Sequence, residues 1–108
     1  MRTNVALPAA AMAFAASLVT LQRTLPAGDS GELIAVADRL GIAHPPGYPL
    51  YTLLGHLWLR VFPFGEPATR LAMLSAVLHA MAAGFLAAAA RRLGLRPVVA
   101  LCAALLWA

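Results

Sequence analysis

Residues 71–90 read LAMLSAVLHAMAAGFLAAAA, an apolar stretch without an Asp, Glu, Lys or Arg. A transmembrane helix needs about 20 consecutive, predominantly apolar residues, so we expect this stretch to cross a bilayer. The composition agrees, because 62% of the residues are hydrophobic and 11% are charged, whereas soluble domains have roughly 45–50% and about 25%. The sequence therefore predicts an all-α integral membrane protein whose first partner is the lipid bilayer.

Two further apolar runs lie towards the ends of the chain. Residues 5–22 carry no charge and fall within the range of about 17–25 residues that spans a bilayer. A cleaved signal peptide is the alternative, since Arg2 gives a positive start and residues 13–15 read AFA, but the spans that follow favour a retained helix. Residues 98–108 are too few to span. We therefore expect residues 1–108 to be the N-terminal fragment of one polytopic membrane domain.

Small residues recur at every fourth position in the first two predicted spans, a spacing that lets helices approach closely. An ionisable residue, His79, lies near the middle of residues 71–90, where such a residue is a functional candidate by default. A hydrogen bond to another helix explains it equally well, and Ser75 lies on the same face. The small residues are Ala9, Ala13 and Ser17 in the first run, and Ala76, Ala80, Gly84 and Ala88 in the second.

All basic residues are arginines, and the formal net charge is +4. The excess of Arg and Ala suggests a GC-rich bacterial genome. Arg91, Arg92 and Arg96 crowd into a short loop, which predicts a cytoplasmic position for it and places residues 23–70 outside the cytoplasm, at a bacterial inner membrane. The remaining arginines are scattered, which excludes the clustered basic face of a nucleic-acid-binding protein. The single cysteine, Cys102, cannot form an intrachain disulfide.

Residues 23–70 contain turns and two short amphipathic segments. Residues 26–31 are rich in turn-forming residues, and residues 32–40 follow with apolar side chains at helical spacing. Residues 44–49 read HPPGYP, and the prolines make this hexapeptide a stiff, extended turn. Residues 50–62 would form a helix of only about 20 Å, so we expect it to lie at the membrane interface.

Asp29 is the first candidate for chemistry. The flanking Gly28 and Gly31 allow a ligand to approach closely, and the carboxylate could act as a general base on an acceptor hydroxyl. A structural role is the alternative, because Asp29 and Glu32 have the spacing of a helix capping box, which the local sequence alone favours. Two carboxylates without an adjacent His are a weak metal signal. We therefore assign no metal site and no cofactor, and the sequence does not decide whether a divalent ion is needed.

Three aromatic or imidazole side chains extend this candidate site. His44 precedes two prolines, and its ring could bind a phosphate or shuttle a proton or make one structural hydrogen bond. Tyr48 and Tyr51 could contact a sugar or a lipid headgroup, although tyrosines are expected at membrane interfaces without any function.

Two motifs together carry a family resemblance. Residues 28–33 read GDSGEL, and residues 43–55 read AHPPGYPLYTLLG. Over residues 25–90 the chain resembles a family of bacterial polytopic membrane proteins that is related to the protein O-mannosyltransferases and to a vertebrate transmembrane O-mannosyltransferase.

The resemblance implies a GT-C-type glycosyltransferase, all-helical and polytopic, that transfers a sugar from a polyprenyl-phosphate donor to an acceptor outside the cytoplasm. It implies that Asp29 acts at the acceptor hydroxyl, and that Glu32 and His44 assist with the donor phosphate or the acceptor. A chain this short lacks the further spans of a donor groove and is expected to be inactive alone. A transporter or flippase subunit using His79 and a non-catalytic membrane remnant are the alternatives.

Overall fold

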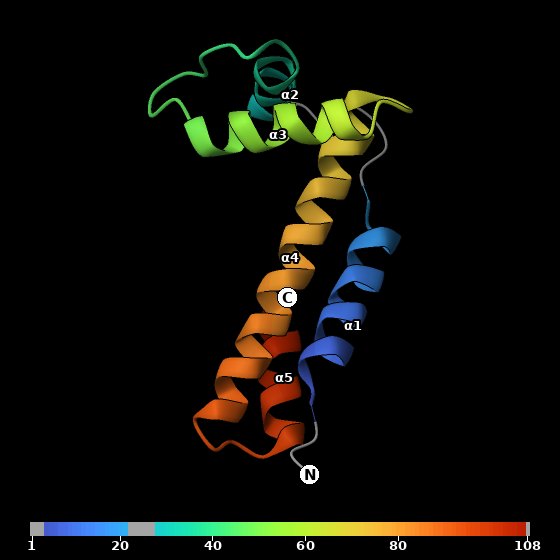
Figure 1. Ribbon diagram of the computed structural model, residues 1–108, viewed down its shortest axis with the longest axis vertical. Helices are drawn as coiled ribbons and strands as arrows, with labels where there is room; N and C mark the ends of the chain where they lie inside the picture. The colour runs from blue at the N-terminus through green and yellow to red at the C-terminus, as the bar shows by residue number, and fades with distance from the viewer. Residues whose placement is uncertain (1–3, 22–27, 108) are drawn as a thin grey trace. The chain divides into compact units, whose positions relative to one another are not determined.

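The computed structural model describes residues 4–21 and 28–107. Within these ranges the regular structure is entirely α-helical and consists of five helices (Figure 1). The chain divides into two compact units, one of Met1–Thr20 with Ser75–Ala108 and one of Leu21–Leu74. The all-α prediction is confirmed. Several residues used in the sequence analysis, namely Arg2, Gln22, Arg23, Pro26 and Ala108, lie outside the described ranges.

The longest helix, α4 (Pro67–Arg92), contains the predicted span of residues 71–90. Its 26 residues give a length of about 39 Å at the usual helical rise, more than the roughly 30 Å of a bilayer core. Proline fits the first turn of a helix because its missing N–H has no intrahelical partner there. In the described part of the chain α4 is the one helix that is both long and apolar enough to cross a membrane.

The other two apolar runs form shorter helices. The first run was expected to span with residues 5–22, but α1 (Ala6–Val19) has 14 residues, and the end of that run lies outside the described residues. The third run forms α5 (Pro97–Trp107), with 11 residues. Both are apolar but fall short of the spanning length, as expected for residues 98–108, and a membrane crossing by α1 stays a prediction.

Small residues form the core of the unit that contains α1 and α5. Ala9, Ala100 and Ala104 are fully buried together with Ala87 of α4. Gly84 shows how closely the backbones approach, because a Cβ placed there would lie 3.2 Å from the carbonyl oxygen of Ala6. The predicted contact through small residues is thus confirmed, and it needs the small side chains to bring the helices together.

His79 lies in the same unit and contacts two other helices. Its Nδ1 is 3.1 Å from the hydroxyl oxygen of Ser17, and its ring centroid is 5.7 Å from that of Trp107. Ser17 donates its hydroxyl proton to the carbonyl oxygen of Ala13, which leaves the oxygen able to accept from the imidazole. A hydrogen bond to another helix, one of the two interpretations of His79, is therefore present.

The second unit consists of α2 (Asp29–Arg39), α3 (Pro49–Val61) and the first turns of α4. Its core contains Ala37, Leu59, Leu71 and Leu74, and Ile34, Tyr51 and Trp58 pack against it. Two of these core residues, Leu71 and Leu74, belong to the predicted span. The start of α4 is thus covered by protein in this unit.

Gly55 lets α2 and α3 pack closely. A Cβ at this position would lie 3.0 Å from the Ala37 Cβ and 3.1 Å from Leu71 Cδ2, distances that a close-packed interior does not accommodate without movement. The His56 ring donates from Nδ1 to the Ala37 carbonyl oxygen at 2.9 Å, which adds a polar contact to the same helix pair.

The corner between α3 and α4 is held by a reciprocal contact. Trp58 Nε1 donates to the Arg70 carbonyl oxygen at 2.8 Å, and the Arg70 guanidinium donates to the carbonyl oxygens of Leu59 at 3.0 Å and Phe62 at 2.7 Å. Leu59 lies in the last turn of α3 and Phe62 is its C-cap, and carbonyls at a helix end have no intrahelical donor. Arg70 therefore satisfies carbonyl oxygens at the C-terminal end of α3 and holds this helix across the first turns of α4 (Figure 1).

The face of α3 that is turned away from α2 is apolar and exposed. Leu50 is 70% exposed, Leu53 61%, Leu57 60% and Val61 60%. The prediction of an amphipathic helix over residues 50–62 is confirmed to within a residue. An apolar face of this kind suits the boundary between headgroups and acyl chains.

Candidate active site

Asp29 is the first residue of α2 and does not act as its cap. Gly28 holds the N-cap position with φ of 89°, and no side chain makes a cap hydrogen bond there. This φ lies in the left-handed region that glycine adopts without steric cost, so the glycine permits the sharp entry into the helix. The capping-box interpretation of Asp29 and Glu32 is therefore wrong, and the Asp29 carboxylate is 79% exposed.

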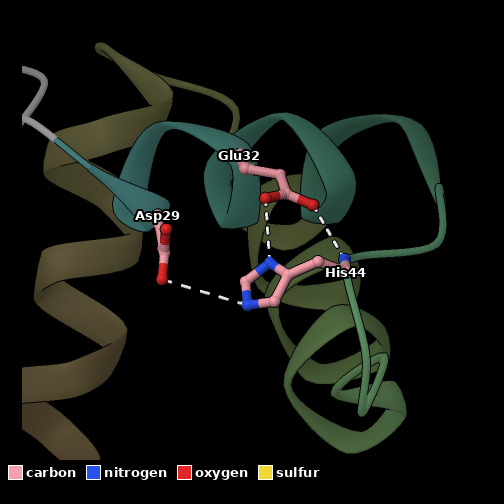
Figure 2. A network of polar contacts seen from close by, with 3 residues as sticks. All are labelled: Asp29, Glu32 and His44. Atoms are coloured by element: carbon pink, nitrogen blue, oxygen red, sulfur yellow. Dashed lines mark hydrogen bonds and ion pairs between the residues drawn. The ribbon is translucent and has the colours of Figure 1, made fainter.

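Glu32 uses both carboxylate oxygens to hold His44. The backbone N–H of His44 donates to Oε1 at 2.8 Å, and His44 Nδ1 lies 2.9 Å from Oε2. An ionised carboxylate only accepts, so Nδ1 carries the proton of this bond. Glu32 thereby fixes the position of the residue and the orientation of its ring, as Figure 2 shows.

The opposite edge of the His44 ring is turned towards Asp29. His44 Nε2 lies 3.9 Å from Asp29 Oδ2 (Figure 2), which is beyond hydrogen-bond length but within the range of a charge interaction. The three side chains all reach solvent, with exposed fractions of 38% for His44 and 43% for Glu32. The imidazole thus lies between two carboxylates from one helix.

The charges in this group shift two pKa values in opposite directions. Hydrogen bonds from the His44 backbone N–H and then from its side chain lower the pKa of Glu32. The side-chain hydrogen bond to Glu32 raises the pKa of His44 against the effect of desolvation, and the charges of Glu32 and Asp29 add to the increase. Hydrogen bonding to the charged form and nearby opposite charge both favour that form, so the site stabilises an imidazolium.

The proline-containing turn places a second ring against His44. The Gly47 N–H donates to the His44 carbonyl oxygen at 2.8 Å, and Tyr48 follows with φ of 43°. The rings of His44 and Tyr48 meet edge to face with centroids 5.7 Å apart. A bulky residue with positive φ is strained, and such strain is found at functional sites.

Tyr51 does not lie with this group. It packs against the core of its unit, and burial raises the pKa of its phenol. The structure thus brings Asp29, Glu32, His44 and Tyr48 together, while the substrate contact expected of Tyr51 stays a prediction. Among the residues that the structure describes, no group of three or more His, Cys, Asp or Glu has the arrangement of a metal site.

The pairing of Glu32 with His44 could not be read from the sequence. The two residues lie 12 positions apart, and the return of the chain depends on Leu40, which has φ of 52° and ends α2. The next residue, Gly41, donates its N–H to the Val36 carbonyl oxygen at 2.9 Å and completes the turn.

Comparison of the sequence with known proteins identifies a family. The family model of the protein O-mannosyl-transferase TMEM260 N-terminal domain matches residues 29–103. A protein O-mannosyl-transferase TMEM260 from mouse is 56% identical over 68 residues, which are 63% of this chain and 10% of the mouse protein. A protein of the same name from Dictyostelium discoideum is 41% identical over 61 residues, 55% of this chain and 7% of that protein.

Both relatives are eukaryotic, so the assignment to bacteria stays a prediction. The chain spans about a tenth or less of the length of these curated relatives. No solved structure gives a significant match. The family match begins at Asp29, covers Glu32, His44 and Tyr48, and continues into α5. Because it includes well over half of the residues, the chain belongs to the TMEM260 N-terminal domain family of protein O-mannosyl-transferases.

Proposed function

We propose that this chain forms the N-terminal part of a membrane O-mannosyltransferase in which Asp29 is the general base that removes the proton from the acceptor hydroxyl. The observation that carries the proposal is the exposed Asp29 carboxylate, free of a capping role at the start of α2 and facing the His44 ring. The family membership supports mannosyl transfer to a protein hydroxyl.

The proposed donor is mannose linked to a polyprenyl phosphate. The phosphate is a good leaving group, so the enzyme must mainly orient the reactants, supply a base and stabilise charge. The hydroxyl oxygen of the acceptor attacks C1 of mannose, the bond between C1 and the phosphate oxygen breaks, and the bonding electrons leave with the phosphate. Asp29 takes the hydroxyl proton. In the proposed site Glu32 and His44 assist at the acceptor, and Tyr48 and Tyr51 contact the sugar or the lipid phosphate.

The proposed setting is the membrane surface outside the cytoplasm. A polyprenyl phosphate carries its headgroup at the interface, and the exposed apolar face of α3 suits the same depth. Arg91 and Arg92 at the end of α4, with Arg96 in the short loop that follows, favour the cytoplasmic side for that end of the helix. In this arrangement Asp29 and the sugar phosphate lie at one membrane surface.

The test uses a chimaera in which residues 29–103 of this chain replace the matching segment of the mouse relative. Mannose transfer by this chimaera to an acceptor peptide is measured in membranes. We expect Asp29→Asn to lower transfer about 10²–10⁴-fold, the usual contribution of a general base. Asp38→Asn is the matched control, because it removes the same charge from the exposed far end of α2. Transfer by Asp29→Asn at the level of the Asp38→Asn control would refute the role of Asp29.

A further inference from the structure

The hydrogen bonds of His44 leave one nitrogen available for a proton. Glu32 binds the Nδ1 proton and the backbone N–H, at 2.9 and 2.8 Å. In the neutral ring Nε2 is then the basic atom, and it is the atom turned towards Asp29 (Figure 2). Within residues 4–21 and 28–107, the titratable side chains that contact the ring are Asp29 and Glu32 from α2, and Tyr48 from the turn before α3.

We propose that His44 receives the acceptor proton from Asp29 and that Glu32 is the positioning residue that makes this transfer possible. This inference rests on the proposed function and deepens it. Asp29 removes the proton, and His44 clears it from Asp29 so that the base is ionised again for the next turnover.

The proton balance is complete without a further reactant. The acceptor O–H bond breaks and the proton moves to an Asp29 carboxylate oxygen as the new bond to the sugar forms. Asp29 then passes the proton to His44 Nε2, and the imidazolium later releases it to water. While it is charged, the imidazolium lies between two carboxylates, an arrangement that favours the charged form.

The distance between Asp29 and His44 fits a site without substrate. Nε2 and Oδ2 are 3.9 Å apart, so a movement of about 1 Å would bring them to hydrogen-bond length. Asp29 is 79% exposed and has room for that rotation, whereas Glu32 holds the His44 ring in place. Catalytic hydrogen bonds are often long before substrate binds.

The kinetic test uses the chimaera described above with Glu32→Gln, His44→Ala and the control Asp38→Asn. Gln keeps the size of Glu32 but removes its charge, so we expect kcat to fall about tenfold to 10²-fold with the KM for the donor unchanged. Because His44 must be neutral to accept a proton, kcat should rise with pH through the His44 pKa, and this limb should move to lower pH in Glu32→Gln. Added imidazole should partly restore His44→Ala.

A second measurement does not depend on transfer. NMR of the His44 ring in the 108-residue chain in detergent micelles should show titration at lower pH in Glu32→Gln than in Asp38→Asn. Equal titration in the two variants overturns the proposal. A rise in donor KM with unchanged kcat also overturns it, because His44 would then bind the phosphate. If Asp29→Asn is inactive but Glu32→Gln behaves like Asp38→Asn in kcat and pH profile, the proton transfer to His44 fails and the role of Asp29 stands.

Discussion

The contact between Glu32 and His44 links the stability of residues 28–61 to pH. Glu32 has a lowered pKa, so its contribution is present above its ordinary value of 4.5 and is lost as the pH falls through the lowered pKa. His44 has a raised pKa, so its contribution is present below 6.5 and is lost as the pH rises through the raised pKa. Both contributions are therefore complete between pH 4.5 and 6.5.

We expect the thermal midpoint of the chain in micelles to be highest in that pH window, and the maximum to flatten in Glu32→Gln. Circular dichroism melts across acidic, neutral and alkaline buffers measure it. Because both side chains reach solvent, the effect should also weaken with added salt. A pH dependence that is the same in the wild-type chain and in Glu32→Gln would contradict the prediction.

At the scale of single residues, the sequence motifs named candidate residues but could not predict the contacts between them. The motifs named Asp29, Glu32 and His44, and all three lie together. The spacing of Asp29 and Glu32 also fitted a cap, and local sequence cannot decide between a cap and a partner 12 residues away. Which contact Glu32 makes depends on the path of the chain after Leu40, and the packing of α2 against α3 sets that path.

At the scale of single helices, Gly55 sets the distance between α2 and α3. We expect Gly55→Ala to destabilise the chain, because overpacking costs about 1–3 kcal/mol while the gain in helix propensity is only about 1 kcal/mol. Gly31→Ala is the matched control, since Gly31 is also helical and a Cβ there meets nothing within 4 Å. That variant should be stabilised by about 1 kcal/mol.

Thermal or denaturant unfolding of both variants in micelles measures the difference. We expect the free energy of unfolding to fall in Gly55→Ala and to rise in Gly31→Ala. If Gly55→Ala were stabilised as much as Gly31→Ala, the close contact of Gly55 with Ala37 and Leu71 would be incorrect.

The helices themselves were largely predictable from breakers and periodicity. Pro49 and Pro67 begin α3 and α4, and proline is favoured in the first helical turn. The predicted start of the segment 32–40 was three residues late, since α2 already begins at Asp29. A helix start depends on the N-cap conformation, here a Gly28 with positive φ, and apolar spacing does not report that conformation.

At the scale of the whole molecule, a membrane-spanning α4 would place its two ends on opposite sides of the membrane. In a Cys102→Ala background, we expect a membrane-impermeant thiol reagent to label Phe64→Cys on intact cells but Leu93→Cys only after permeabilisation. Phe64 is 88% exposed and Leu93 82%, so both sites are accessible to the reagent. Arg91 and Arg92 at the end of α4, together with Arg96 just beyond it, favour the cytoplasmic side for Leu93. Equal labelling of both sites on intact cells would contradict a spanning α4.

Composition predicted a membrane protein, but not how the chain divides. The predicted span of residues 71–90 includes Leu71 and Leu74, yet they are 2% and 7% exposed and pack with Leu59 in the second unit. Hydropathy treats a leucine in lipid and a leucine in a protein core alike. The division of the chain into two units therefore depends on contacts with α3, which lies outside the apolar residues 71–90.

The two tryptophans give each unit its own spectroscopic reporter. Trp58 donates to Arg70 in the unit of Leu21–Leu74, and Trp107 lies against His79 in the other. Since the chain has only these 2 tryptophans, the tryptophan emission of a Trp107→Phe variant reports on α3 and its surroundings alone, and that of Trp58→Phe on the helices around His79. Unfolding of the candidate active site can thus be observed by emission separately from that of the small-residue core.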